Sequence, residues 1–541
     1  MDVKPVRSSD GSAKSEMGAI APPTLLNDAD DLDRQIATMS PEEYAKVEKK
    51  LKIKMDLQVV LLCGVFYLLS FLDRTNIASA RIMGLVEDLK LSEHDFSVVL
   101  TVLYPTYICF EIPSNLLLKK VGAARLLPTL VVCWGIACIT QGVVTTKTGL
   151  YINRIFLGLA EAGLLPGLIL YSTFFYKPSE IQLRQAIYFG GASMAGAFGG
   201  LIAAGIENIQ AAGWNPWRWL FIVEGLLTVF VGFICFFLLP NGPEKLKGLT
   251  PLEKRVALHR VGKGSGQDYA AGEKHAALIN PGQDQFAPVG NPDIERETHR
   301  FKLNVFWKVA TDPFGLLLAM VNFCTVVGVF STAFFAPTIV RSLGISTQRT
   351  TILLLTVPPY IASFLFSIAL GVFAGRYRWR GGACFMGITL AIVGYATAYA
   401  ASTPAGGYAG LIIMSMGSFS LGPIIFAWSS LGTWSHYKRA ITVALMIVFS
   451  NSGAIVSVWL DFPEEGSVQH ASGFLINLAL NIAALFFLAA LETYVWYDRR
   501  EKAAGRRDWK ADKVREQFPG ATPEQVREYL GDEAAEFKRD Y

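Results

Sequence analysis

The sequence predicts an all-α membrane protein that crosses the bilayer twelve times, in two halves of six helices, with both termini in the cytoplasm. Three observations predict this fold class: a shortage of charged residues, their separation from long apolar runs, and the position of basic residues between the runs. Of the 541 residues, 52% are apolar and 17% are charged, against about 25% charged in soluble domains. This composition excludes a soluble enzyme with one core, a disordered chain and a basic nucleic-acid binder.

The charged residues gather in residues 1–56, 240–312 and 498–541, and leave apolar runs between them. Each run is about 20 residues long, which is enough to cross a hydrocarbon core about 30 Å thick. The first half, residues 57–239, is expected to contain spans at 57–80, 95–118, 126–145, 150–175, 185–207 and 219–239. The second half, residues 314–496, is expected to contain spans at 314–338, 350–374, 382–401, 408–431, 440–460 and 472–496. The rest forms a cytoplasmic N-terminal tail (1–56), a cytoplasmic central loop (240–313) and a cytoplasmic C-terminal tail (497–541).

The polar segments contain three starts of short helices. Ser40, Thr250 and Thr522 each precede a proline, with Glu or Gln three residues after the capping residue. This spacing is typical of a capping box followed by proline at the first helical position. Residues 262–292, which contain several Gly and Pro, are expected to form a linker.

Basic residues between the spans set the orientation. With a cytoplasmic N-terminus, the inside segments carry Lys46, Lys49, Lys50, Lys119, Lys120, Arg125, Lys177, Arg184, Arg376, Arg378, Arg380, Lys438 and Arg439. The opposite loops carry few basic residues, as the positive-inside rule requires. Both termini are therefore expected in the cytoplasm, which requires an even number of spans.

The seven cysteines all fall inside apolar runs, without disulfide or zinc spacing. We expect them to pack as small apolar residues. The sequence suggests no metal and no cofactor.

A few ionisable residues lie inside the first six spans. They are Asp73, Arg74, Glu111, Arg154, Glu161 and Glu224. A charge at bilayer depth costs about 3 kcal/mol on insertion scales, so these side chains should face protein or water. The second half is expected to supply mostly neutral polar groups, such as Asn322, Tyr360, Ser415 and Asn451.

The spacing of these charges suggests that they serve different partners. Arg154 and Glu161 lie on one helix face with a rise of about 10 Å between them, and Asp73 and Arg74 point about 100° apart. Arginine can bind a carboxylate bidentately, and a partly desolvated acid can exchange protons near neutral pH. A cavity flanked by both types of group suits a proton-coupled carrier of an anion.

Structural interpretations stand beside this one. Arg154 lies near the outer end of its span, from which it can extend to the interface. Asp73 and Arg74 can form a structural pair, and structural roles are favoured for Glu111 and Glu224.

Small residues and prolines mark helix contacts and kinks. A small-residue ridge recurs every four residues in the fifth span, at Ala192, Gly196, Gly200 and Ala204. Such ridges let another helix approach closely. They occur both between helices that slide against each other and between helices that stay packed together. Pro166 in the fourth span and Pro358 in the eighth predict kinks.

Four segments together carry a resemblance to a known family. They are Asp73–Ile77, Glu111–Asn115, Arg154–Gly163 and Trp217–Gly225. The chain resembles the major facilitator superfamily over residues 55–510, and within it the anion:cation symporter family. It is most similar to the fungal branch of allantoate, nicotinate and pantothenate permeases.

The resemblance implies a twelve-helix carrier, not an enzyme, that works by alternating access as a proton-driven importer of a small organic anion of the carboxylate, vitamin or ureide type. It implies proton sites at Asp73 and Glu161, with Arg154 tuning the nearby carboxylate. It implies substrate contacts at Arg74 and, from the second half, at Asn451. The expected partners are the lipid bilayer, the anion and protons, and no nucleic acid. The protein is expected to work as a monomer in the plasma membrane.

Two other functions remain open at this stage. One is a proton-antiport exporter of a metabolite or drug, because Trp434 departs from the family pattern after the tenth span. The other is a membrane nutrient sensor that does not transport. Asp73, Arg154 and Glu161 argue against the sensor, because a receptor has no need of proton sites.

Overall fold

The computed structural model is all-helical in the residues that it describes, which are 23–176, 178–209, 213–262, 307, 310–433, 436–460, 472–530, 534 and 539. Trp434 and all but the first residue of the expected linker 262–292 lie outside the described residues. Eleven described helical runs are long and apolar enough to cross a membrane.

The first half comprises α3 (Leu61–Ile82), α5 (Glu93–Thr101) with α6 (Leu103–Val121), α7 (Ala123–Gly142), α8 (Lys147–Glu161) with α9 (Leu164–Thr173), α10 (Pro178–Phe189) with α11 (Gly191–Ile206), and α12 (Pro216–Leu238). The short helix α4 (Leu85–Asp88) follows α3. The expected second span is split between α5 and α6 and is not among the eleven runs.

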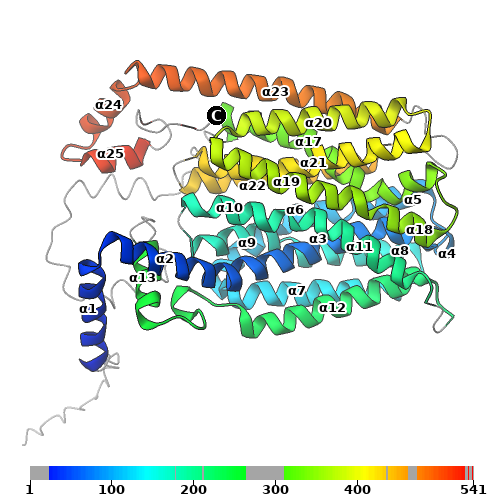
Figure 1. Cartoon of the computed structure of the whole chain (residues 1–541), viewed down its shortest axis with the longest axis horizontal. Coiled ribbons are helices and arrows are strands. Elements are labelled where there is room, and N and C mark those ends of the chain that lie inside the picture. Colours follow the sequence, from blue (N-terminus) through cyan, green and yellow to red (C-terminus); the bar gives the residue numbers. More distant parts are fainter. Residues whose placement is uncertain are drawn as a thin grey trace, which may run out of the picture.

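The second half comprises α17 (Pro313–Ser342), α18 (Arg349–Leu355) with α19 (Val357–Tyr377), α20 (Arg380–Ala400), α21 (Pro404–Leu431), α22 (His436–Val458) and α23 (Ser472–Ala503). The fold class predicted from the sequence, an all-α membrane protein of two six-helix halves, is confirmed. Figure 1 shows the two halves side by side, with α1 (Pro23–Thr38), α13 (Pro251–Gly262), α24 (Trp509–Gln517) and α25 (Pro523–Leu530) at one end of the bundle.

Three spans are interrupted shortly before a proline, because proline lacks the N–H that would bond four residues back. The fourth span breaks at Ala162 and Gly163, and the eighth breaks at Thr356. Both kinks predicted from the sequence are confirmed. A third break, at Val102 in the second span, precedes Pro105 and was not predicted.

The three predicted capping boxes are also confirmed. The backbone N–H groups of Glu43, Glu253 and Gln525 donate to the side-chain oxygens of Ser40, Thr250 and Thr522 at 3.3, 3.2 and 3.2 Å. Each short helix begins where its local sequence satisfies the first free N–H groups. The helix that starts after Ser40, α2 (Pro41–Met55), continues through the π-helical turn η1 (Asp56–Val60) into α3 without a break.

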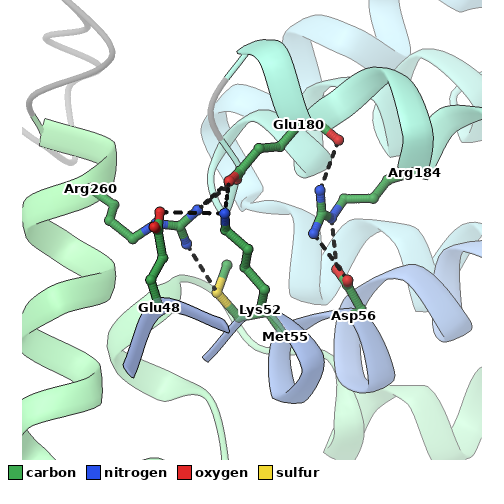
Figure 2. A network of polar contacts seen from close by, with 7 residues as sticks. All are labelled: Glu48, Lys52, Met55, Asp56, Glu180, Arg184 and Arg260. Atoms are coloured by element: carbon green, nitrogen blue, oxygen red, sulfur yellow. Dashed lines mark hydrogen bonds and ion pairs between the residues drawn. The ribbon is translucent and has the colours of Figure 1, made fainter. Parts of the chain in front are cut away.

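A buried polar network holds the central-loop helix α13 on the first half (Figure 2). Arg260 of α13 donates to Glu48 of α2 at 2.8 Å and to Glu180 of α10 at 2.6 Å. Beside it, Arg184 pairs with Asp56 at 2.7 Å. The network therefore joins the start of the fifth span, the extension of the first span and the central loop at one end of the bundle.

Charge attraction keeps Glu180 of this network ionised. Burial opposes this, but hydrogen bonds and charges from Lys52 and Arg260 hold the pKa of Glu180 below its usual value. A lowered folded-state pKa contributes stability above the unfolded pKa and loses it as the pH falls through the folded pKa. The network is therefore intact at neutral pH and weakens only in acid.

The small-residue ridge of the fifth span faces the eighth span across the two halves. A β-carbon on Gly196 would lie 2.5 Å from Cε1 of Tyr360, and one on Gly200 would lie 2.7 Å from Oγ1 of Thr356. Further out, Arg349 pairs with Glu207 at 3.5 Å. The two halves are therefore in contact at the end of the bundle that carries Glu207 and Arg349, which we call the outer end. The two glycines make that contact possible.

We predict that Gly200→Leu weakens this outer contact. Overpacking of a tight contact costs about 1–3 kcal/mol, so the closed arrangement should become about tenfold less populated. The measurement is cross-linking between cysteines introduced at Glu207 and Arg349 in membranes. Gly205→Leu is the matched control, because a β-carbon there meets no atom within 4 Å. Equal cross-linking in both variants would contradict the prediction.

Candidate functional site

A cavity lies between the two halves; together with the solvent-open space around it, it comprises about 490 Å³ not occupied by atoms. The first half contributes residues of α3, α6, α9 and α10, and the second half contributes residues of α17, α21 and α22. Of the residues singled out in the sequence, Arg74 and Asn451 both line this cavity. They come from opposite halves, so a ligand between them would contact both.

Arg74 is held by Glu161 from the fourth span. Nε of Arg74 donates to Oε1 of Glu161 at 2.9 Å and to Oε2 at 3.1 Å. The hydroxyl of Ser70, one helical turn before Arg74, donates to the same carboxylate. The guanidinium also lies 4.9 Å from the ring centroid of Tyr107. The only strong anion-binding group named among the cavity-lining residues is thus already paired with a carboxylate of the protein.

Close helix packing places Glu161 at this position. A β-carbon on Gly158 would lie 2.5 Å from the carbonyl oxygen of Leu103, so α8 contacts the second span at its break. Glu161 is the last residue of α8, just before the break in the fourth span. Arg154, two turns earlier, is only 2% exposed, and its Nε and Nη2 lack a protein hydrogen-bond partner. Arg154 is therefore buried in the first half, and its side chain does not extend to the membrane–water interface.

Asp73 faces a different environment from its neighbour Arg74. Cys138 of α7 donates its S–H to Oδ1 of Asp73 at 3.5 Å. Asp73 is one of three buried ligand-type residues, with Cys138 and Glu224, whose side-chain atoms lie within 4.8 Å of one another. The interpretation of Asp73 and Arg74 as a structural pair is therefore wrong, because each side chain has its own partners.

Aromatic residues make up half of the cavity lining. Phe71 of α3 stacks on Phe330 of α17 with centroids 6.0 Å apart, and Phe189 of α10 stacks on Phe426 of α21 at 5.0 Å. Both pairs cross between the halves. Asn451 adds a buried amide whose Nδ2 has no protein hydrogen-bond partner. The cavity thus combines flat apolar walls with one guanidinium and one free amide donor.

Several cavity residues were not predicted from the sequence. Tyr67, Ser70 and Phe71 precede Arg74 by seven, four and three residues, which places all four on one helical face. That periodicity was available from the sequence. Tyr107 gave no comparable signal.

The expectation that the second half holds mostly neutral groups within its spans needs one correction. Glu492 lies in the expected last span and is half-buried in α23. Its carboxylate packs against Gly381 at the start of α20, and Oε1 lacks a protein hydrogen-bond partner. It lies outside the set of residues that line the cavity.

Comparison with known proteins gives consistent matches. The profile of the Major Facilitator Superfamily matches residues 63–458. Uncharacterized transporter C11D3.18C of Schizosaccharomyces pombe is 32% identical over 417 residues, covering 76% of this chain and 77% of that protein. MFS-type transporter cnsO of Penicillium expansum is 29% identical over 459 residues, covering 80% and 83%. The xylose transporter XylE from E. coli, in a partially occluded inward open conformation, is similar in fold, with a TM-score of 0.56, 14% identity, and coverage of 80% of this chain and 97% of that one.

We predict that Arg74 and Glu161 are energetically coupled. Removing one partner of a buried ion pair costs about 3–5 kcal/mol, because the other charge is left uncompensated. Arg74→Gln and Glu161→Gln should each lower the free energy of unfolding by this amount, and the double variant should lower it by less than the sum. The measurement is denaturant unfolding of the purified protein in detergent. Arg349→Gln, in a half-exposed pair, is the control and should cost less than about 1 kcal/mol. Additive losses would refute the coupling.

Proposed function

Because the chain belongs to the major facilitator superfamily, and is therefore a multi-pass membrane transporter rather than an enzyme, we propose that it imports a small organic anion together with protons. The cycle is alternating access of the central cavity to the two sides of the plasma membrane. The monomer is the proposed working unit. The substrate is proposed to be a carboxylate, within the broader class of carboxylates, vitamins and ureides.

The contact of one donor of Arg74, Nε, with both carboxylate oxygens of Glu161 is the observation that carries this proposal. A substrate carboxylate that approaches Arg74 competes with Glu161 for the same guanidinium. Two carboxylates close together repel each other in a low-dielectric site, so both do not remain ionised beside one guanidinium. A proton on Glu161 neutralises it and frees Arg74 for the substrate. Anion and proton therefore bind together in this scheme.

Asp73 and Arg154 are proposed to act behind the cavity. Arg154 is the cation that attracts Asp73, and Glu161 repels it. Protonation of Glu161 therefore removes a negative charge that repels ionised Asp73. The positive charge of Arg154 influences how strongly Asp73 then binds its own proton. One proton per monovalent anion moves no net charge; if a second proton accompanies it, one net positive charge enters per cycle, and a potential of 100 mV then supports about fifty-fold accumulation, at about 2.3 kcal/mol per charge.

The cavity wall favours a carboxylate with a flat ring. Phe71, Phe330, Phe189 and Phe426 line the cavity, and because their faces stack on one another they offer apolar ring edges to a ligand ring. Arg74 and Asn451 offer donors for one carboxylate. A ureide carries many more amide groups than these donors can satisfy, so nicotinate fits the cavity better than allantoate.

The test is uptake of labelled nicotinate, pantothenate and allantoate by cells expressing the protein, with and without a proton uncoupler. We expect nicotinate to accumulate, the uncoupler to abolish accumulation, and Glu161→Gln to make the remaining uptake insensitive to external pH. Asn451→Ala should raise KM about tenfold, the value of one hydrogen bond of about 1.4 kcal/mol.

Glu207→Gln is the matched control, because Glu207 pairs with Arg349 at the outer end and is not a cavity residue. If none of the three anions enters, or if uptake ignores both the uncoupler and Glu161→Gln, the symport proposal fails. Faster efflux from preloaded cells would indicate the exporter instead.

A further inference from the structure

A second group of buried acids lies behind the cavity, inside the first half. Asp73 of α3 is 3% exposed and Glu224 of α12 is 1% exposed. One carboxylate oxygen of each acid and Sγ of Cys138 lie within 4.8 Å of one another. Glu224 has no assigned role in the transport scheme above.

Each carboxylate uses one oxygen and leaves the other without a protein partner. Cys138 donates to Oδ1 of Asp73, and Asn76 donates its Nδ2 amide to Oε2 of Glu224. Oδ2 of Asp73 and Oε1 of Glu224 are buried and have no protein hydrogen-bond donor. An acceptor buried in this way is costly unless a proton or donor satisfies it.

The surrounding helices supply one cation for these two acids. Arg154 of α8 attracts both Asp73 and Glu224, whereas Arg74 is engaged by Glu161. The neighbouring α7 contributes the thiol of Cys138 and the indole N–H of Trp134, two uncharged donors that lie beside Asp73. On the remaining side α11 presents Gly199, whose β-carbon would lie 2.8 Å from Oδ1 of Asn76, and α11 contains no titratable residue.

The charges of this region therefore do not balance when every group is ionised. Three carboxylates, Asp73, Glu161 and Glu224, face two guanidiniums, Arg74 and Arg154. One negative charge remains in excess at a depth where uncompensated charge is strongly disfavoured. A single proton removes the excess.

We propose that Asp73 and Glu224 share one proton, which makes Glu224 a further proton-coupling residue of this carrier. The proton lies on one carboxylate, whose O–H donates to the free oxygen of the other. When the proton leaves, both acids are ionised and Arg154 is the one cation beside them. Loss of the proton therefore changes the charge around Arg154. The coupling role rests on the proposed proton-driven transport; the shared proton itself does not.

The experiment is infrared difference spectroscopy of the purified full chain in lipid nanodiscs, titrated in pH without any substrate. The probe is the C=O stretch of a protonated carboxylic acid, in choline buffer and again in sodium buffer. Bands from the other buried acids are identified with Glu111→Gln and Glu492→Gln. Because no substrate is present, a failure of the uptake experiment leaves this test unaffected.

We expect wild type to show a protonated-acid band at neutral pH that both Glu224→Gln and Asp73→Asn abolish. Either substitution leaves one carboxylate beside Arg154, which is a neutral pair that needs no proton. Glu207→Gln, at the outer end, should leave the band unchanged. Absence of the band in wild type, its survival in either variant, or its loss on addition of sodium at constant pH would overturn the proposal; the last result would indicate a bound cation in place of the proton.

Cys138→Ala covers the case in which the charge variants do not fold. It removes the single S–H, which Asp73 Oδ1 shares at 3.5 Å with the carbonyl oxygen of Phe221, without changing any charge. The band should persist but move in frequency, because one hydrogen bond to the pair is lost. A band that keeps its position in Cys138→Ala would contradict its assignment to this pair.

Discussion

The ion pair between Arg74 and Glu161 is the interaction on which the transport site depends. A guanidinium inside a membrane protein needs a carboxylate or water nearby, because an uncompensated charge there is costly. Arg74 lines the central cavity, and Glu161 contacts it from a helix packed against the second span through Gly158. In the proposed mechanism a substrate carboxylate competes with Glu161 for this guanidinium, which links substrate binding to the charge state of Glu161.

The two halves contribute unequally to this chemistry. The first half supplies the charges at the cavity and behind it, while the second half supplies aromatic surfaces and the amide of Asn451. The two halves meet at the outer end through Gly196 and Gly200, which let the fifth and eighth spans approach closely. A movement of the halves against each other therefore changes access to the cavity without rearranging the buried charges of the first half.

Local features of the structure followed from the sequence, whereas long-range partnerships did not. Hydropathy located the spans, and capping residues such as Ser40 and Thr250 located helix starts, because both depend on nearby residues only. The neighbours Asp73 and Arg74 were expected to serve different partners, but their partners lie 65 and 87 residues away in sequence. Which helices pack together decides those contacts, and no local pattern encodes it.

The cavity wall shows the same limit. The chain has 35 phenylalanines, and hydropathy cannot tell which of them face lipid and which face a ligand. The face of α3 that carries Tyr67, Ser70 and Arg74 was predictable from helical spacing once Arg74 was chosen. The stacking of Phe71, on the same face, against Phe330 was not predictable, because that contact depends on how the two halves meet.

The most direct test of the account is the number of protons taken up when the anion binds to the purified protein. Calorimetric titration with nicotinate, repeated in buffers of different ionisation enthalpy, gives this number without transport. The account predicts uptake of about one proton per anion near neutral pH in wild type, and none at this site in Glu161→Gln, which should still bind. Binding without proton uptake in wild type, or the same uptake in Glu161→Gln, would contradict the competition for Arg74.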